Sequence, residues 1–299
     1  MDPIEKARVF VYQNARPLEL ARWQYHFENG DKQNVLQALE VYQNEDGGFG
    51  YGLEPDNWNP NSTPIATWMA CNILREIDSL DSKNPLVKGI LTYLSSEKDF
   101  SQGKWFNQVP STIDYPHAIW WESAKGVPSD NPTVSLAGMI LVTSEKDSFL
   151  YQKAQDIIKQ AVADFVEEPT NEMHTLVVYL EMLYYCEEAD FTFVLDHVPF
   201  RELLKRQIRQ TVAPDPEAWF TEYVSKPSDY FLIKNQVLDI LDEEICHIET
   251  TKILENQLED GSFIVPWEWG NEYSEFFISR QWWKSIIIIK NFLFLRNFA

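Results

Sequence analysis

Basic residues are scarce in this sequence. Its 299 residues include 25 lysines and arginines against 46 aspartates and glutamates, which gives a formal net charge of −21 at pH 7. A surface of this charge repels the phosphate groups of nucleic acids and of anionic lipids. We therefore expect no nucleic-acid partner and no binding to an anionic membrane surface.

Cysteine is scarce too, and no leader segment is visible. Cys71, Cys186 and Cys246 are far apart and odd in number, which argues against a disulfide framework and favours reduced thiols. Residues 1–6 contain no basic stretch followed by an apolar one, so the sequence gives no sign of a signal peptide. Together these features predict a cytoplasmic protein.

Long apolar runs are missing as well. The most apolar stretch, residues 286–295, is interrupted by Lys290 and followed by Arg296. It is well short of the roughly 20 apolar residues that a membrane-spanning helix needs. We expect a buried closing helix there and no transmembrane segment. Asn-Gly hairpins between alternating runs, the usual sign of paired strands, are nearly absent.

What the sequence does contain is apolar bulk with a helical period. Hydrophobic residues make up 44% and aromatic residues 14%, enough for a large core. Proline follows Arg16, Thr63 and Asn131, at positions typical of a first helical turn, and Thr63 and Asn131 are suitable N-caps. Including weaker signals, the expected helix starts are near residues 17, 63, 131, 171, 228 and 274.

Each of these helices follows another one. The preceding helices are expected at residues 4–14, 32–43, 85–96, 149–167, 199–211 and 243–257. Six helix pairs form a solenoid pattern, since each pair must bury its apolar face on its neighbours, and six pairs can also close on themselves. No linker divides the chain. We therefore predict an all-α fold, an (α/α)6 toroid of about twelve helices in an inner and an outer ring, as a single domain over residues 1–299.

One turn pattern occurs twice. Residues 43–49 and 257–263 both read Gln-x-x-Asp-Gly-(Gly/Ser)-Phe at the end of an expected helix. Glycine favours the left-handed cap conformation and Asp favours the turn. The Gln amide is therefore expected to bond backbone groups of the adjacent helix pair, while the aromatic ring packs between pairs. Degenerate copies are expected around Trp105 and Trp219.

This turn pattern and the helix rhythm resemble the QW-type repeats of the terpenoid cyclase and protein prenyltransferase superfamily. The resemblance implies an α-α toroid whose inner helices surround a central cavity, with a small or isoprenoid-like apolar ligand bound in it. In such proteins the repeated turn braces the fold and does not catalyse. The resemblance therefore says more about architecture than about chemistry.

The motifs that carry catalysis in that superfamily are missing here. The sequence has no Asp-x-Asp-Asp tetrad for protonating an alkene and no good Asp-Asp-x-x-Asp/Glu motif for Mg²⁺ and diphosphate. The nearest acidic cluster includes Asp239, Asp242 and Glu243, expected on one helical face as a solvated surface. Cys246 and His247 are adjacent and lack the zinc-binding pattern. We predict no metal and no cofactor; Mg²⁺ is the one candidate, and no motif supports it.

Carboxylates and an aromatic residue follow the first turn. Glu54, Asp56 and Trp58 lie in the loop before the helix expected near residue 63, which a toroid would place at one mouth of its cavity. The two carboxylates are candidate catalytic groups, as acid, base or cation stabiliser, and Trp58 is a candidate ligand contact. The structural alternative is that they cap the next helix and neighbouring loops.

A second loop, before the helix expected near residue 131, contains a histidine and two tryptophans. His117 and Glu122 are candidate catalytic residues, because a histidine acts as an acid or a base near neutral pH. Trp120 and Trp121 suit ligand contact through stacking or cation stabilisation, and equally suit packing.

The other ligand-contact candidates are spread along the chain. Trp267, Glu268 and Trp269 follow the second turn, at the equivalent position of the repeat. His174 starts one expected inner helix and Trp68 lies within another. A helix cap and a core position are the structural alternatives for these last two.

Three functions fit this pattern. The leading prediction is a toroid that binds, and in the enzyme case converts, a small or isoprenoid-like apolar ligand in an aromatic, acidic cavity. The second is a carbohydrate-active toroid, a hydrolase or lyase with carboxylates beside tryptophan platforms. The third is a non-catalytic scaffold whose cavity is filled by its own side chains. The sequence leaves open both the catalytic activity and the oligomeric state.

Overall fold

The computed structural model describes residues 1–232, 237 and 239–298. The protein is all-α, as predicted, with one small sheet in addition. Two compact units make up the chain: unit 1 contains residues 1–41 and 209–299, and unit 2 contains residues 42–208. The predicted toroid and the predicted single domain depend on how these two units combine, so they stay predictions.

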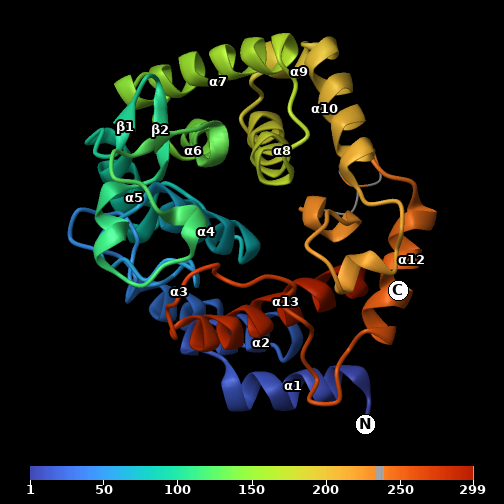
Figure 1. Ribbon diagram of the computed structural model, residues 1–299. Helices are drawn as coiled ribbons and strands as arrows, with labels where there is room; N and C mark the ends of the chain where they lie inside the picture. The colour runs from blue at the N-terminus through green and yellow to red at the C-terminus, as the bar shows by residue number, and fades with distance from the viewer. Residues whose placement is uncertain (233–236, 238, 299) are drawn as a thin grey trace. The chain divides into compact units, whose positions relative to one another are not determined.

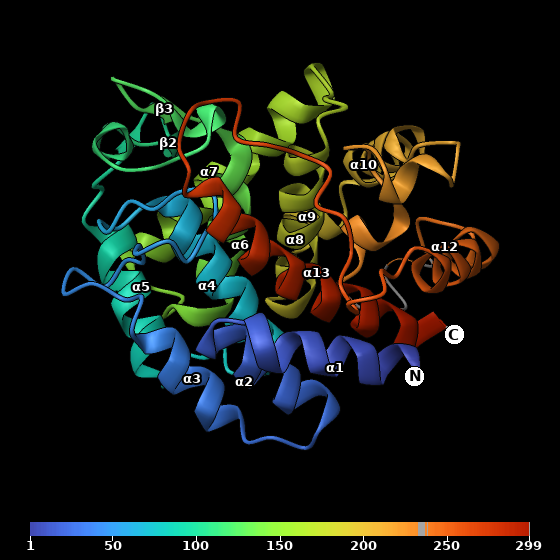
Figure 2. The same cartoon turned by 60° about the horizontal axis from the view of Figure 1, so that its bottom comes forward.

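Unit 1 brings the two ends of the sequence together. Helices α1 and α2, from the start of the chain, pack against α13 near its end, and α12 packs against α13 as well. Figure 2 shows the blue first helices beside the red last one. The elements are α1 (Pro3–Asn14), α2 (Pro17–Phe27), α3 (Lys32–Glu40), η3 (Ala218–Phe220), η4 (Pro227–Tyr230), α12 (Glu243–Glu255) and α13 (Phe276–Phe298).

Unit 2 is built around α6. This helix packs against α4, α7 and α8 and against the strand β2. These neighbours on several sides explain why α6 is apolar all round. Figure 1 shows α7 running past α6 and α8. The helices are α4 (Pro64–Glu76), α5 (Pro85–Ser95), α6 (Asp130–Thr143), α7 (Phe149–Glu167), α8 (Met173–Glu188), α9 (Thr192–Leu195) and α10 (Val198–Thr211), whose last turn enters unit 1.

Most predicted helix starts are confirmed. Helices begin at Pro17 and Pro64, and Thr63 caps the second of these by accepting a bond from the Ala66 N–H at 3.1 Å. The starts expected near 171 and 274 lie two residues later, at Met173 and Phe276. Near 228 only the short 3-10 helix η4 is present, and the residues that would continue it, 233–236 and 238, lie outside the described residues.

The sheet was not predicted. Strands β1 (Phe100–Ser101), β2 (Lys104–Gln108) and β3 (Val127–Pro128) form an antiparallel sheet in the order β1-β2-β3. The β1–β2 hairpin turns on Gln102 and Gly103, both with positive φ, which is the type I′ geometry. The degenerate turn copy expected around Trp105 is therefore wrong as a helix end. Trp105 lies in a strand, fully buried.

The three cysteines are buried and form no disulfide, as predicted. Burial raises the pKa of the Cys186 thiol from 9.0 to about 12, and it also raises the pKa of Cys71. Because the thiolate is the reactive form, the native protein at pH 8 is expected to react with a thiol reagent roughly a thousandfold more slowly than the unfolded chain. Colorimetric thiol titration with and without denaturant checks this, and fast labelling of the native protein would contradict the burial.

No helix within the described residues is long and apolar enough to cross a membrane. The apolar stretch at 286–295 is the expected buried closing helix. It lies within α13, where Ile288, Ile289 and Phe292 are buried.

Candidate functional site

The first copy of the repeated turn, turn A (residues 43–49), docks on the first turn of α5. Gln43 Nε2 donates to the carbonyl of Gly47 at 2.9 Å and to that of Leu86 at 3.0 Å. Gly47 has a φ of +89° and lies so close to α5 that an added Cβ would be 2.1 Å from the Gly89 carbonyl oxygen. The predicted bond from the Gln amide to the adjacent helix is confirmed.

The second copy, turn B (residues 257–263), repeats this geometry on α1. Gln257 Nε2 donates to the carbonyl of Gly261 at 3.1 Å and to that of Pro3 at 2.9 Å. Gly261 also has a φ of +89°, and its added Cβ would be 2.2 Å from the Lys6 carbonyl oxygen. Turn B thus joins residues 257–263, which follow α12, to the first helix of the chain. Both turns are structural clamps.

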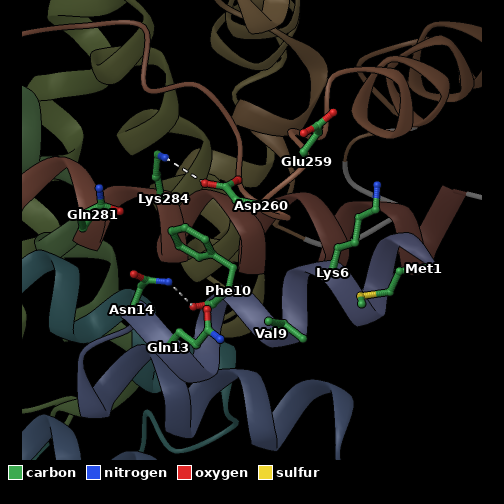
Figure 3. A pocket seen from close by; sticks show the side chains of 10 residues that line it. All are labelled: Met1, Lys6, Val9, Phe10, Gln13, Asn14, Glu259, Asp260, Gln281 and Lys284. Atoms are coloured by element: carbon green, nitrogen blue, oxygen red, sulfur yellow. Dashed lines mark hydrogen bonds and ion pairs between the residues drawn. The ribbon is translucent and has the colours of Figure 1, made fainter.

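A surface pocket lies beside each turn. The pocket at turn B has a volume of about 430 Å³, and the pocket at turn A about 390 Å³. Figure 3 shows Lys284 reaching across the first of these to Asp260, 3.5 Å away. In the second, Lys98 lies 3.0 Å from Asp46. Since each turn carboxylate already pairs with a lysine, neither pocket is a good site for an apolar ligand.

The two loops predicted to contain catalytic groups lie together in unit 2. The backbone N–H of Trp58 donates to the carbonyl of Pro116 at 3.0 Å, and the backbone N–H of Ala118 donates to the carbonyl of Asp56 at 2.8 Å. These bonds bring Glu54, Asp56 and Trp58 beside the loop of His117. The indole of Trp58 donates within its own loop, to the Pro55 carbonyl at 2.9 Å.

Burial favours the structural alternative for these loops. Glu54, Asp56 and His117 are all buried, and each makes contacts with the protein. His117 Nδ1 lies 2.6 Å from the Tyr115 carbonyl oxygen. The structure therefore brings Glu54, Asp56 and His117 together where the two loops are joined by backbone hydrogen bonds. A catalytic role for them stays a prediction.

The tryptophans of the second loop are more accessible. Trp120 is 37% exposed, Glu122 is also exposed, and Trp121 is half-buried. His174 is exposed at the start of α8, where its backbone N–H donates to the Glu172 carboxylate at 3.0 Å. The helix-start position of His174 is thus confirmed, and its role as a ligand contact stays a prediction.

The candidates after turn B belong to unit 1. Trp269 is buried and its ring lies 6.1 Å from that of Phe276, so it packs in the core. Trp267 is half-buried, with its ring 5.3 Å from that of Trp283. Glu268 between them is exposed. Whether these residues share a cavity mouth with the unit 2 loops stays a prediction.

Partly exposed side chains follow one face of α4. Trp68, Asn72 and Arg75 lie at positions i, i+4 and i+7, so they share one side of the helix. Across from them, α8 contributes Glu181 and Tyr184. We call these five residues the α4–α8 face.

A single buried carboxylate organises this face. Glu181 is 2% exposed, and its Oε2 accepts hydrogen bonds from Trp68 Nε1 and Ser135 Oγ, both at 2.6 Å. Its Oε1 lies 3.4 Å from a guanidinium nitrogen of Arg75. Because Ser135 belongs to α6, the Glu181 side chain connects three helices and fixes the positions of the indole and the guanidinium.

The Arg75 guanidinium completes a neutral, aromatic-flanked ion pair. It donates to the Tyr185 hydroxyl at 3.1 Å and lies 5.8 Å from the Tyr184 ring. Burial alone would lower the pKa of Arg75, but Tyr185 and Glu181 together raise it, so the group stays charged. The face therefore combines apolar rings with polar groups whose net charge is close to zero.

A similar arrangement occurs in unit 1, between α2 and α13. Arg16 forms a bidentate pair with the buried Glu19, both contacts being 2.7 Å, and its guanidinium lies 4.9 Å from the Trp282 ring. Here both oxygens of the carboxylate are held by one arginine, and both side chains are almost fully buried. This pair is a core feature, in contrast to Trp68 and Arg75 of the α4–α8 face, which are partly exposed.

No group of three or more His, Cys, Asp and Glu side chains that could hold a metal ion is present in the described part of the chain. The expectation that Asp239, Asp242 and Glu243 share one helical face is wrong. Asp239 lies in a turn and Asp242 is the N-cap residue of α12, because the helix begins only at Glu243.

Sequence reasoning identified Trp68 and missed the rest of the α4–α8 face. A signal for Glu181 was present: it is the one acid in the run Leu176–Leu183, which is otherwise apolar apart from a tyrosine hydroxyl. A buried charge needs a partner and hydrogen bonds, so such an acid predicts a polar cluster. The sequence carried no comparable signal for the pairing with Arg75, 106 positions away.

The carboxylates of the two turns, Asp46 and Asp260, are expected to make the stability of the protein decrease at acid pH. Burial raises the pKa of Asp46, but hydrogen bonds from Ser62 and Lys98 outweigh it, so the pKa lies below 3.8; the pKa of Asp260 is lowered in the same way. Their stabilisation is complete above about pH 3.8 and is lost as pH falls through the lowered values. In urea titrations from pH 6 to 2.5, the free energy of unfolding of Asp46→Asn should fall less steeply with decreasing pH than that of the wild type. The control Asp156→Asn, which changes an exposed carboxylate, should keep the wild-type dependence on pH. The same pH dependence in the two variants would contradict the assignment of the acid-sensitive stability to Asp46.

The chain was compared with protein-family models, with curated proteins and with solved structures, and none of the three comparisons found a match.

Proposed function

We propose that this protein binds a small, mostly apolar molecule on the α4–α8 face. The observation that supports this most directly is the partly exposed row of Trp68, Asn72 and Arg75 beside the buried Glu181. The indole supplies apolar contact area, and the Glu181 carboxylate holds it in one orientation through the bond to Nε1. Pre-organised aromatic side chains lose little entropy when a ligand binds.

Charge favours an apolar ligand over an ionic one. Glu181 and Arg75 neutralise each other, and the whole chain carries a net charge of −21. An anion meets the negative charge of the protein, and the neutralised pair leaves no net local charge to hold an ion of either sign. The burial of an apolar surface is then the main source of binding free energy.

The architecture in this proposal is the α-α toroid of terpenoid cyclase-like and prenyltransferase-like proteins, in the cytoplasm and without a resident cofactor. Turn B supports it within unit 1. Turn B docks on α1, the first helix of the chain, in the same way as turn A docks on α5 in unit 2. Such a contact is what a closed ring of helix pairs requires. The proposal is for binding, because the sequence lacks the superfamily's catalytic motifs.

Titration with the neutral, polarity-sensitive dye Nile red tests the binding site. Trp68→Ala is expected to weaken binding by roughly tenfold to a hundredfold, which corresponds to the loss of one large apolar contact. Trp120→Ala is the matched control, because it removes an exposed indole that lies in a loop of unit 2 and not on α4. This variant should bind Nile red normally. Absence of saturable binding to the wild type, or equal effects of the two variants, would disprove the proposal.

A carbohydrate-binding function is favoured by one observation. Trp120 is 37% exposed and two residues from the exposed Glu122 carboxylate, the combination that a sugar-stacking platform needs. Affinity electrophoresis in neutral polysaccharides tests it: retardation of the wild type that Trp120→Ala abolishes and Trp68→Ala leaves intact would favour carbohydrate binding over an apolar ligand.

A further inference from the structure

The α4–α8 face has hydrogen-bonding groups that the protein itself does not satisfy. Asn72 Oδ1 is buried and has no hydrogen-bond partner among the described residues. Arg75 donates to the Tyr185 hydroxyl and to Glu181, which accounts for two of its five N–H donors. The others have no acceptor in the part of the chain that the structure describes, and the side chain is 18% exposed.

These groups are neighbours. Asn72 and Arg75 are three residues apart on α4, so their side chains leave the same side of the helix about 5–6 Å from each other. Trp68 lies one turn further back on the same side. An acceptor, a set of donors and an apolar ring thus follow one another along about two turns of helix.

The charges of the face exclude some head groups. A phosphate or diphosphate offers only acceptors in its ionised form, so it leaves Asn72 Oδ1 unsatisfied, and it lies close to the Glu181 carboxylate. An ammonium group could donate to Asn72 but offers donors only, so it leaves the remaining N–H groups of Arg75 without an acceptor. A buried polar atom that stays unpaired weakens binding, so both ionic classes are disfavoured.

A hydroxyl group satisfies both partners at once, because its O–H donates to Asn72 Oδ1 and its oxygen accepts from Arg75. We infer that the ligand of the α4–α8 face is an uncharged apolar alcohol, with the hydroxyl held between Asn72 and Arg75 and the hydrocarbon part against Trp68. This inference rests on the proposed function, since it specifies the head group of the apolar ligand proposed there.

Three probes with the same unsaturated carbon skeleton test the inference: farnesol, farnesyl diphosphate and the deoxy hydrocarbon 2,6,10-trimethyldodeca-2,6,10-triene. Each is titrated against Nile red bound to the intact protein. Farnesol is expected to bind about tenfold more tightly than the hydrocarbon, which corresponds to one or two net hydrogen bonds, and farnesyl diphosphate is expected to bind most weakly. Equal binding of farnesol and the hydrocarbon, or tightest binding of the diphosphate, would overturn the inference and leave the proposed function standing. If no probe displaces the dye, the proposed function fails as well.

Asn72→Leu, which has a similar shape and no acceptor, separates hydrogen bonding from structure. It should remove the preference for farnesol over the deoxy hydrocarbon, while the hydrocarbon binds as before. Asn34→Leu, at an exposed position of α3, is the control and should keep the preference. If Asn72→Leu does not fold, Asn72→Ala provides the same readout with less bulk. A preference for farnesol that persists in the folded Asn72 variant would overturn the assignment of the hydroxyl to this residue.

Discussion

Gly47→Ala and Gly261→Ala should each lower the free energy of unfolding by about 3 kcal/mol or more. Two costs add up in both variants. A residue with a Cβ at φ +89° is strained by roughly 1–2 kcal/mol. In addition, the new Cβ would lie 2.1 Å or 2.2 Å from a backbone carbonyl oxygen of the docked helix. That oxygen belongs to a helix and cannot rotate away, so turn and helix must separate, at the cost of roughly 1–3 kcal/mol that overpacking brings.

Gly103→Ala is the matched control for this effect. Gly103 has a φ of +78° in the β1–β2 hairpin, and nothing lies within 4 Å of an added Cβ. The control therefore carries the conformational strain alone and should lose only about 1–2 kcal/mol. Urea unfolding followed by tryptophan fluorescence measures all three variants. Equal losses at the three positions would mean that the close approach of the turns to their helices contributes nothing to stability.

The clamping role of these turns was predictable because it depends on local chemistry. Glycine and aspartate at a helix end specify a left-handed turn, and the glutamine that precedes them by three or four positions has no other local partner. Gln43 and Gln257 do bond the backbone of another helix. The sequence could not specify which helix would be docked, since a backbone carbonyl such as that of Leu86 is the same for every residue type.

The sheet and the α4–α8 face were not predictable in the same way. The hairpin at Gln102 and Gly103 uses a glutamine in the left-handed region, where Asn, Asp or Gly is the usual sign, and its strands are too short for an alternating pattern. The bonds of Glu181 link residues on α4, α6 and α8. Such contacts depend on the packing of whole helices, which a helical period alone does not determine.

The second large effect is expected at the centre of the α4–α8 face. Glu181→Leu should lower the free energy of unfolding by about 3–5 kcal/mol, because removing one partner of a buried ion pair leaves the other charge uncompensated. Here the Arg75 guanidinium, with 18% of its side chain exposed, would keep its charge among apolar neighbours. The same change also removes the acceptor for Trp68 Nε1 and for the Ser135 hydroxyl. Chemical denaturation at neutral pH measures the loss.

A double-mutant cycle separates the ion pair from these other bonds. Replacing Arg75 by Met in the Glu181→Leu background removes the unpaired charge and fills its place with an apolar chain, which should recover about 2 kcal/mol. The recovery is incomplete, since the indole and the Ser135 hydroxyl still lack their acceptor. Purely additive losses for Glu181→Leu and Arg75→Met would show that the two charges are not coupled. The neutral ion pair beneath the proposed ligand would then have to be abandoned, and with it the argument that ionic ligands are disfavoured.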